Sequence, residues 1–208
     1  MGQSRLTRIL ISLPRRLPIL IKSALFCKMR FGSWGIRSVL SKHHRIIGYK
    51  NIFVGDRCFF GPNLRLEAIT CYAGEQFYPQ IEIGDNVCIN QNFHCTCAES
   101  IKIGRGTSIT ANVGIFDIIH PYEDIEVNPR EATINTKPIV IGEDCLIGMN
   151  SVIMPGTKLG NHCIVGANST LSGAFPDYCV IVGSPAKIIK KFDFEKKEWI
   201  KVKKGKCL

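Results

Sequence analysis

The sequence predicts an all-β solenoid, in which short strands coil around one axis and stack on one another. The first observation is an aliphatic residue at every sixth position: Ile141, Ile147, Ile153, Leu159, Val165 and Leu171. The second is a small residue four positions after each of the first five: Cys145, Ser151, Thr157, Cys163 and Ser169. A fixed period of this kind is typical of repeat architectures, whereas an ordinary alternating sheet has a period of two.

Each group of six residues is expected to form one short strand and one bend. Three such groups return the chain to its starting direction and make a triangular coil, and successive coils stack at the strand spacing of about 4.8 Å. The aliphatic residue points into the prism, and the small residue lies inside near a corner. We therefore expect Cys58, Cys145 and Cys163 to be small buried residues rather than redox or metal-binding groups.

The same pattern appears upstream in a less regular form. Its members there are Val54, Phe60 and Leu66, followed by Ile83, Ile89, Cys95 and Ile101. The frame then slips by two residues to Ile103, breaks at residues 117–138 and resumes at Ile141. The sequence thus predicts a solenoid over residues 46–186 with an extruded loop at 117–138.

The chain of 208 residues has a formal net charge of +10, but this charge is concentrated at its two ends. Residues 1–50 contribute +11, residues 51–185 contribute −7 and residues 186–208 contribute +6. An acidic body argues against nucleic acid as a partner, because phosphate recognition needs a contiguous basic face.

Residues 1–45 mix basic side chains with apolar ones, and we predict that they cap the first coil, since a solenoid needs its terminal coil covered. Residues 17–26 within them are expected to form an amphipathic helix. A basic amphipathic segment also suits peripheral contact with an anionic membrane, and the two roles are compatible. Residues 187–208 are predicted to form a short basic helix with a Lys-rich tail.

No stretch has the roughly 20 uninterrupted apolar residues of a membrane-spanning helix, and no secretory signal is recognisable. We therefore expect a cytoplasmic protein, with any membrane contact at the inner face. The ten cysteines include no C-x-x-C pair, so the sequence predicts neither a metal site nor a disulfide framework.

The hexads and the segment Gly183-Ser184-Pro185-Ala186-Lys187 that follows them resemble the hexapeptide-repeat acyltransferases, over residues 46–192. This resemblance implies a left-handed parallel β-helix, an exception to the usual right-handed crossover. It also implies a homotrimer and acetyl-CoA as the donor. Within the family the sequence is most similar to sugar and polysaccharide O-acetyltransferases related to galactoside and maltose acetyltransferases. We therefore expect O-acetylation of a sugar hydroxyl in a cell-envelope polysaccharide or its precursor.

His120, which opens the extruded loop, resembles the catalytic histidine of the family. Acetyl transfer from a thioester to a hydroxyl needs a general base that works near neutral pH, and His meets this need. A second group must fix the tautomer of the ring, and Asp117, Asp124 or a backbone carbonyl are the alternatives. Tyr122, two residues further on, is expected among the substrate contacts.

In the sugar acetyltransferases that this sequence resembles, an asparagine contacts the acceptor. His94 occupies the matching position in this sequence. We expect His94 to contact the substrate, and the alternative is a histidine that lies on the solenoid surface without a role. Asn92 is a second, weaker candidate for the same contact.

The resemblance also places coenzyme A along the outside of the later coils, between neighbouring subunits. The positions that match the family's donor contacts are Leu146, Gly148, Met149, Ala167, Ser172, Lys187 and Lys190. The two lysines match basic positions near the nucleotide phosphates, where Lys acts as a point charge. The alternative for them is the solvated face of a C-terminal helix.

Four other functions fit the repeat less well. An amino-sugar N-acetyltransferase is possible because the repeat does not distinguish O from N acceptors. A serine acetyltransferase would carry a larger helical N-terminal domain, and a γ-type carbonic anhydrase would need three zinc-binding histidines. A non-catalytic scaffold is disfavoured by the loop that contains His120.

Overall fold

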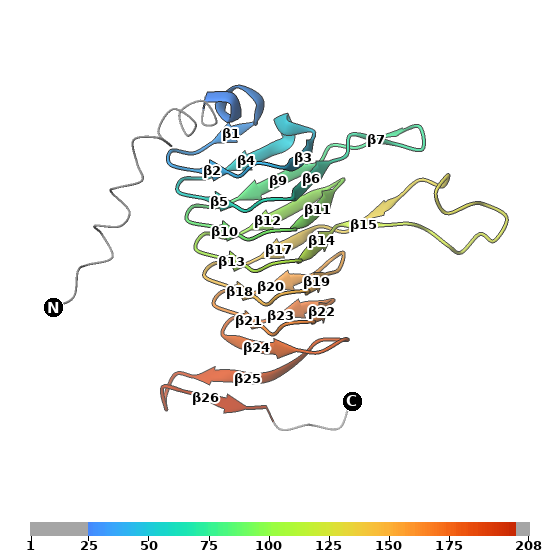
Figure 1. Ribbon diagram of the computed structural model, residues 1–208. Helices are drawn as coiled ribbons and strands as arrows, with labels where there is room; N and C mark the ends of the chain where they lie inside the picture. The colour runs from blue at the N-terminus through green and yellow to red at the C-terminus, as the bar shows by residue number, and fades with distance from the viewer. Residues whose placement is uncertain (1–24, 203–208) are drawn as a thin grey trace.

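The computed structural model describes residues 25–202. They form a left-handed parallel β-helix with three flat faces (Figure 1). The first face contains β1 (Ser33–Trp34), β4 (Ile52–Val54), β9 (Gln80–Ile83), β12 (Ser100–Ile103), β17 (Ile139–Ile141), β20 (Lys158–Leu159) and β23 (Ala174–Phe175). The second face contains β2 (Val39–Leu40), β5 (Phe59–Phe60), β10 (Cys88–Ile89), β13 (Ser108–Ile109), β18 (Leu146–Ile147), β21 (Ile164–Val165) and β24 (Cys179–Val182). The third face contains β3 (His44–Ile47), β6 (Leu64–Ala68), β11 (His94–Cys97), β14 (Gly114–Phe116), β19 (Val152–Ile153) and β22 (Thr170–Leu171).

The six-residue repeat produces the three faces, as the sequence predicts. Ile141, Ile147 and Ile153 lie on the first, second and third face in turn. Each pairs in register with the aliphatic residue one coil later, as Ile141 does with Leu159. All six aliphatic residues of this run are at most 2% exposed. Full burial of each such side chain stabilises the fold by about 1.5–3 kcal/mol.

The slip in the upstream frame has a simple geometric cause. Ile101 and Ile103 both point inward from β12, and both are at most 1% exposed. The residues Ile81 and Ile83 of β9 pair with them in register. These strands on the first face, and β17 after them, therefore carry one more inward position than β20 and β23.

The small residues near one corner are buried and also donate hydrogen bonds. The thiol of Cys58 donates to the carbonyl of Gly84 at 3.0 Å, and that of Cys145 to the carbonyl of Gly160 at 3.1 Å. Burial raises the pKa of the Cys58 thiol, so the proton stays on the sulfur. The predicted interpretation of these cysteines as small buried residues agrees with the structure.

A ladder of asparagines runs down the corner between the second and third faces. Its side chains are linked by four hydrogen bonds of 2.8–3.1 Å. Every member has a left-handed backbone, with φ between 56° and 60°, which Asn tolerates better than most residues. The members are Asn63, Asn92, Asn112, Asn150 and Asn168.

The solenoid begins earlier than the predicted boundary at residue 46. Its first coil starts at β1, and a helix over residues 25–30 precedes it. Phe31 and Trp34 close the end of the core, with ring centroids 4.6 Å apart. Part of the predicted cap is therefore a coil in its own right. Most of the expected amphipathic helix at 17–26 lies outside the described residues.

The predicted C-terminal helix is wrong, because this segment forms a β-hairpin. β25 (Lys187–Asp193) pairs antiparallel with β24, and β26 (Glu198–Lys201) pairs antiparallel with β25. Ile188 packs against the core, and the backbone of β25 satisfies the open edge of β24, the second-face strand of the last coil. An isolated helix would have left that edge unpaired.

Two hairpins leave the solenoid where the third face ends (Figure 1). One is the predicted break at 117–138, which begins with β15 (Ile118–Ile119) paired to β16 (Asn135–Thr136). The other, β7 (Cys71–Tyr72) with β8 (Glu75–Gln76), was not predicted. A single 3₁₀ turn, η1 (Tyr49–Asn51), links the first two coils. Within residues 25–202, no helix has the length and hydrophobicity needed to cross a bilayer.

Candidate active site

His120 lies at the base of the longer hairpin, directly after β15, with its side chain exposed. Its Nδ1 atom is 3.2 Å from the carbonyl oxygen of Pro129, on the returning part of the same loop. A carbonyl can only accept a hydrogen bond, so this contact places the proton of the neutral ring on Nδ1. Nε2 is then the atom with a free lone pair, which a general base requires.

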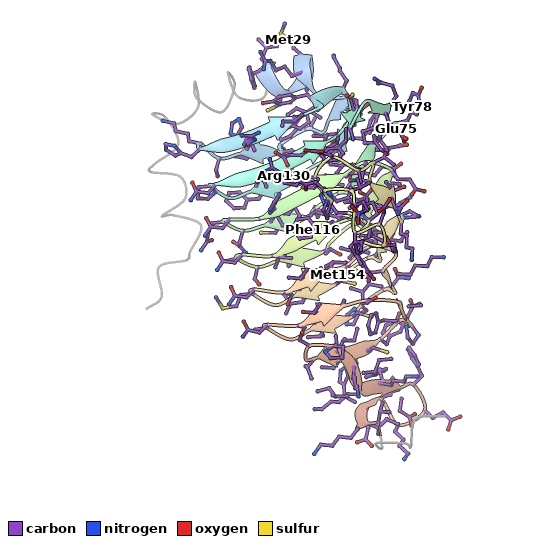
Figure 2. The ribbon with its side chains drawn as sticks, turned by 90° about the vertical axis from the view of Figure 1, so that its right-hand side faces the viewer. Met29, Glu75, Tyr78, Phe116, Arg130 and Met154 are labelled. Atoms are coloured by element: carbon purple, nitrogen blue, oxygen red, sulfur yellow. The ribbon has the colours of Figure 1, made fainter. Side chains whose placement is uncertain are left out.

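Tyr72 of the shorter hairpin holds His120 from the other side. The two rings meet edge to face, with centroids 5.5 Å apart and planes at 69°. The Tyr72 hydroxyl donates to the carbonyl of Arg130 at 2.8 Å, one residue beyond Pro129. Figure 2 views the molecule from the side of the hairpins and labels Arg130 in the longer one. His120 is thus fixed by two hairpins that are far apart in the sequence.

Asp117 is completely buried and supports the base of the hairpin. Its carboxylate accepts the backbone N–H groups of Ala98, Glu99 and Ser100 at 2.8–2.9 Å. It also accepts the thiol of Cys97 at 3.2 Å, and burial together with the charge of Asp117 raises the pKa of that thiol. Asp117 therefore holds the backbone of the neighbouring coil.

Of the three groups considered for orienting His120, the structure gives the ring hydrogen bond to a backbone carbonyl. The carboxylate of Asp124, the other acidic candidate, accepts the N–H of Glu126 at 3.0 Å. Tyr122 is 74% exposed in the same loop, and its N–H is bonded to the carboxylate of Glu123.

His94 points outward from β11 on the third face and is half-buried. Its Nε2 is 3.1 Å from the hydroxyl of Thr96, and its ring packs edge to face on Phe116 at 5.0 Å. Gly114 makes room for this packing, because a Cβ there would come within 2.8 Å of the Phe116 ring. Burial, and then the charge of Arg65, lower the pKa of His94, so the ring is neutral at neutral pH.

Glu67 lies beside His94 and is the buried charge of this cluster. Only 7% of its side chain is exposed, and it forms ion pairs with Arg45 at 3.1 Å and with Arg65 at 2.9 Å. Burial acts to raise the pKa of this carboxyl. The hydrogen bond and charge of Arg65, with the charge of Arg45, outweigh burial and lower the pKa, so Glu67 is ionised.

A hollow of about 310 Å³ is lined by one neighbour of each histidine, although neither histidine is part of its lining. Glu67, whose oxygen Oε2 is 3.9 Å from Nε2 of His94, lines one part of it, and Tyr72, which packs on His120, lines another. Ile47 and Ile69 provide apolar walls. A larger hollow of about 520 Å³ lies over the first face, and its lining includes neither Glu67 nor Tyr72, the residues that contact the two histidines. The smaller hollow is therefore the better candidate for an acceptor site.

Asn92 has a different role from His94, although only Phe93 lies between them in the sequence. Its side-chain amide donates to Asn112 at 2.8 Å and its oxygen accepts from Asn63 at 3.1 Å. Both polar groups of Asn92 thus take part in the corner ladder.

The predicted donor positions lie mainly along the corner between the second and third faces. Leu146 and Met149, which are 41% and 47% exposed, flank Gly148 at the end of β18. A Cβ on Gly148 would come within 2.5 Å of the backbone of Ala167, one coil below. Lys187 is the first residue of β25 and pairs with Val182, the last residue of β24. These residues form a convex edge.

The remaining two donor candidates lie apart from this edge. Ser172 is exposed just after β22, at the opposite end of the third face. Lys190 is half-buried within β25, where it pairs with Val180.

Sequence reasoning missed Tyr72, Pro129, Arg65 and Glu67. One signal was available for the shorter hairpin, since Leu66 and Ile83 are 17 residues apart, which is not a multiple of six. Within residues 25–202, no group of three or more His, Cys, Asp or Glu side chains is placed to hold a metal ion.

The family described as Bacterial transferase hexapeptide (six repeats) matches residues 138–173. A chain of Escherichia coli K12, named "Putative lipopolysaccharide biosynthesis O-acetyl transferase WbbJ", is 37% identical over 158 residues. The match covers 73% of this chain and 77% of that relative.

Two solved structures share the fold at low sequence identity. A point mutant of AntD, an N-acyltransferase from Bacillus cereus, in complex with dTDP and coenzyme A has a TM-score of 0.66 at 19% identity, over 83% of this chain and 90% of the other. A galactoside acetyltransferase in complex with coenzyme A has a TM-score of 0.55 at 20% identity, over 92% and 79%. Identities this low support the fold alone.

Proposed function

Because the chain belongs to the hexapeptide-repeat acetyltransferases, we propose that it transfers the acetyl group of acetyl-CoA to a sugar hydroxyl in a cell-envelope polysaccharide or its precursor. The observation that carries this proposal is the arrangement around His120. Its Nδ1 contacts the Pro129 carbonyl, its Nε2 is left as a base, and its ring packs on Tyr72, which lines the hollow. The name of the Escherichia coli relative supports the acceptor class.

The proposed reaction uses the lone pair of His120 Nε2. This atom takes the proton of the acceptor hydroxyl while the oxygen attacks the thioester carbonyl of acetyl-CoA. The resulting imidazolium has its charge stabilised by the Pro129 carbonyl at Nδ1. When the tetrahedral intermediate collapses, the C–S bond breaks and the proton passes from Nε2 to the thiolate. The products are the acetyl ester and free coenzyme A, so His120 is neutral again.

The acceptor is proposed to lie in the hollow between Tyr72 and Glu67. Its apolar walls suit the carbon-bound face of a sugar ring, and a few polar groups fix its orientation, as in most small-molecule sites. His94, neutral and hydrogen-bonded to Thr96, is a proposed acceptor contact.

The donor is proposed to lie along the corner that carries Leu146, Gly148, Met149 and Ala167, with Lys187 towards the phosphates. A convex edge supplies only one wall of a groove, so a second wall is needed to enclose coenzyme A. A homotrimer, in which the neighbouring subunit supplies that wall, meets this need. Ser172 and Lys190 are weaker candidates because they lie away from the edge.

A peripheral membrane contact through the basic N-terminal residues remains part of the proposal. Since residues 33–45 belong to the first coil, the informative deletion is residues 1–24 alone. We expect this deletion to weaken sedimentation with vesicles of anionic phospholipid and to leave a folded protein. Unchanged sedimentation would show that residues 1–24 do not bind the membrane.

The main test compares wild-type protein with the His120→Ala variant. Thiol release from acetyl-CoA is measured with a panel of saccharide acceptors, and the variant is expected to lose about 10²–10⁴-fold in kcat. His162→Ala is the matched control, because His162 is exposed on a coil and packs on Tyr178 instead of the hollow.

Two results would contradict the proposal. Undiminished turnover by His120→Ala would remove the assigned base. A product that resists mild alkali would be an amide, since acetyl esters are cleaved under those conditions, and would favour the amino-sugar alternative.

A further inference from the structure

Two arginines occupy directly opposite positions on the third face. Arg45 on β3 and Arg65 on β6 are register partners, and their side chains are 68% and 47% exposed. Like charges placed opposite each other on neighbouring strands are destabilising. Two arginines at these positions therefore need a nearby group of opposite charge.

Glu67 compensates only half of this charge. It lies two residues after Arg65 on the same side of β6 and accepts hydrogen bonds from both guanidinium groups. The carboxyl is ionised, and His94 beside it is neutral at neutral pH, because the pKa values of both groups are lowered. Two arginines and one carboxylate therefore leave one net positive charge.

The cluster also has hydrogen-bond donors to spare. Each guanidinium carries five N–H donors in a rigid fork, whereas Glu67 has only two oxygens. Because Glu67 is buried, it fixes both forks while 68% of the Arg45 side chain and 47% of the Arg65 side chain stay open to solvent. This geometry suits a planar carboxylate or a phosphate, which arginine binds in a bidentate manner.

The position of the cluster links it to the acceptor hollow. Glu67 and Ile47, the outward neighbours of the two arginines along β6 and β3, both line that hollow. Tyr72, on another part of its wall, packs on His120. An acceptor that spans the hollow would present a hydroxyl to His120 at one end and a second group to the arginines at the other.

We propose that Arg45 and Arg65, held by Glu67, form a subsite for a carboxylate or phosphate group of the acceptor. This inference rests on the proposed function, because it assumes that the hollow receives a saccharide. It narrows the acceptor class to acidic saccharides, saccharide phosphates or saccharides joined to a carrier through phosphate.

The test compares acceptors that differ in charge. Methyl β-glucuronide carries a carboxylate, glucose 1-phosphate carries a phosphate, and methyl β-glucoside is neutral. In wild-type protein we expect kcat/KM to be higher for the charged acceptor that fits the subsite. In Arg65→Gln the ratio of charged to neutral kcat/KM should fall by about 10- to 100-fold, mainly through KM, which is the usual effect of losing a charge-assisted hydrogen bond.

Arg57→Gln is the matched control. Arg57 belongs to the same coil, donates to Asn86 at 2.7 Å and lies outside the hollow, so the variant removes the same charge without touching the subsite. Its charged-to-neutral ratio should equal that of wild type. Arg65→Lys keeps the charge without the fork and should recover part of the ratio.

Equal ratios in wild type and Arg65→Gln, or an equal fall in Arg57→Gln, would overturn the subsite. Where Arg65→Gln does not fold, Arg45→Gln replaces it, because Arg45 is the more exposed of the two. The proposed function has a separate readout, which is turnover of any acceptor by wild-type protein. If no acceptor is turned over, calorimetric titration of both charged compounds into wild type and Arg65→Gln still decides the subsite, and equal affinities would reject it.

Discussion

The upper coils, over residues 33–116, and the lower coils, over residues 139–182, are built from one repeat but present different chemistry. In the lower coils the chain follows the period without insertion, and the outward positions of the third face carry Val152, Met154, Thr170 and Ser172. The same columns of the upper coils carry Arg45, Arg65, Glu67 and His94. Within residues 33–182, hairpins leave only from the upper coils and from the junction between the two regions.

The comparison shows that the core and the site are specified separately. Inward residues are apolar and buried in both regions, so the fold is maintained by the same kind of contact throughout. Function differs where side chains point outward and where the chain leaves the coil. A solenoid can therefore gain a site by insertion without repacking its core.

The largest expected effect is at the junction, where Asp117 joins a regular coil to the hairpin. Asp117→Ala removes the acceptor for three backbone N–H groups, and we expect it to lower the free energy of unfolding by about 3 kcal/mol. Urea denaturation measures this loss. Asp124→Ala, in the exposed part of the same loop, is the control and should change the free energy by less than about 0.5 kcal/mol.

Loss of activity without loss of stability in Asp117→Ala would support a catalytic role for Asp117. A variant that keeps wild-type stability and binds acetyl-CoA, but does not turn over, would mean that the carboxylate acts on His120 and not on the backbone.

A smaller effect is expected at Tyr72, which ties one hairpin to the other. Tyr72→Phe removes the hydrogen bond to the Arg130 carbonyl, worth about 1 kcal/mol, so kcat should fall about fivefold. Tyr72→Ala also removes the ring that packs on His120 and should cost more. Steady-state kinetics measure both, and Tyr78→Phe, 89% exposed after the same hairpin, should match wild type. Wild-type kcat in Tyr72→Phe would contradict a positioning role.

The smallest effect concerns acid stability of the charged cluster. His94 has a lowered pKa, so the unfolded chain takes up its proton first and stability declines as the pH falls below about 6.5. Glu67, also lowered, loses its stabilising charge on further acidification below about 4.5. Denaturation at several pH values should show the first decline in wild type and a flatter curve in His94→Gln. Identical curves would show that His94 does not contribute.

The sequence carried enough information for the core but only part of the site. A period of six determines which side chains point inward, which is why the burial of Ile147 and Cys145 was predictable. The loop with His120 was visible as a break in the period. Tyr72 was not predictable, because its role depends on two hairpins that meet only after the coils have stacked.

The C-terminal error has a related cause. Residues 187–193 are basic and show no marked hydrophobic period. Their pairing with β24 follows from the unpaired edge that β24 has in the last coil. That edge is a property of the assembled solenoid and is not visible in the segment itself. Handedness, likewise, came from resemblance to a family and not from the residues.

The hairpin of β25 and β26 has a consequence for the behaviour of the molecule in a crowded cell. A parallel β-helix ends in open strand edges to which another chain can add, and such edges lead to fibre growth. Here β25 runs antiparallel across β24, and the Gly183–Ala186 segment bonds to Thr170 at the end of the third face. The chain thus covers the open edge of its own second face at this end, so that another chain cannot add to β24 there.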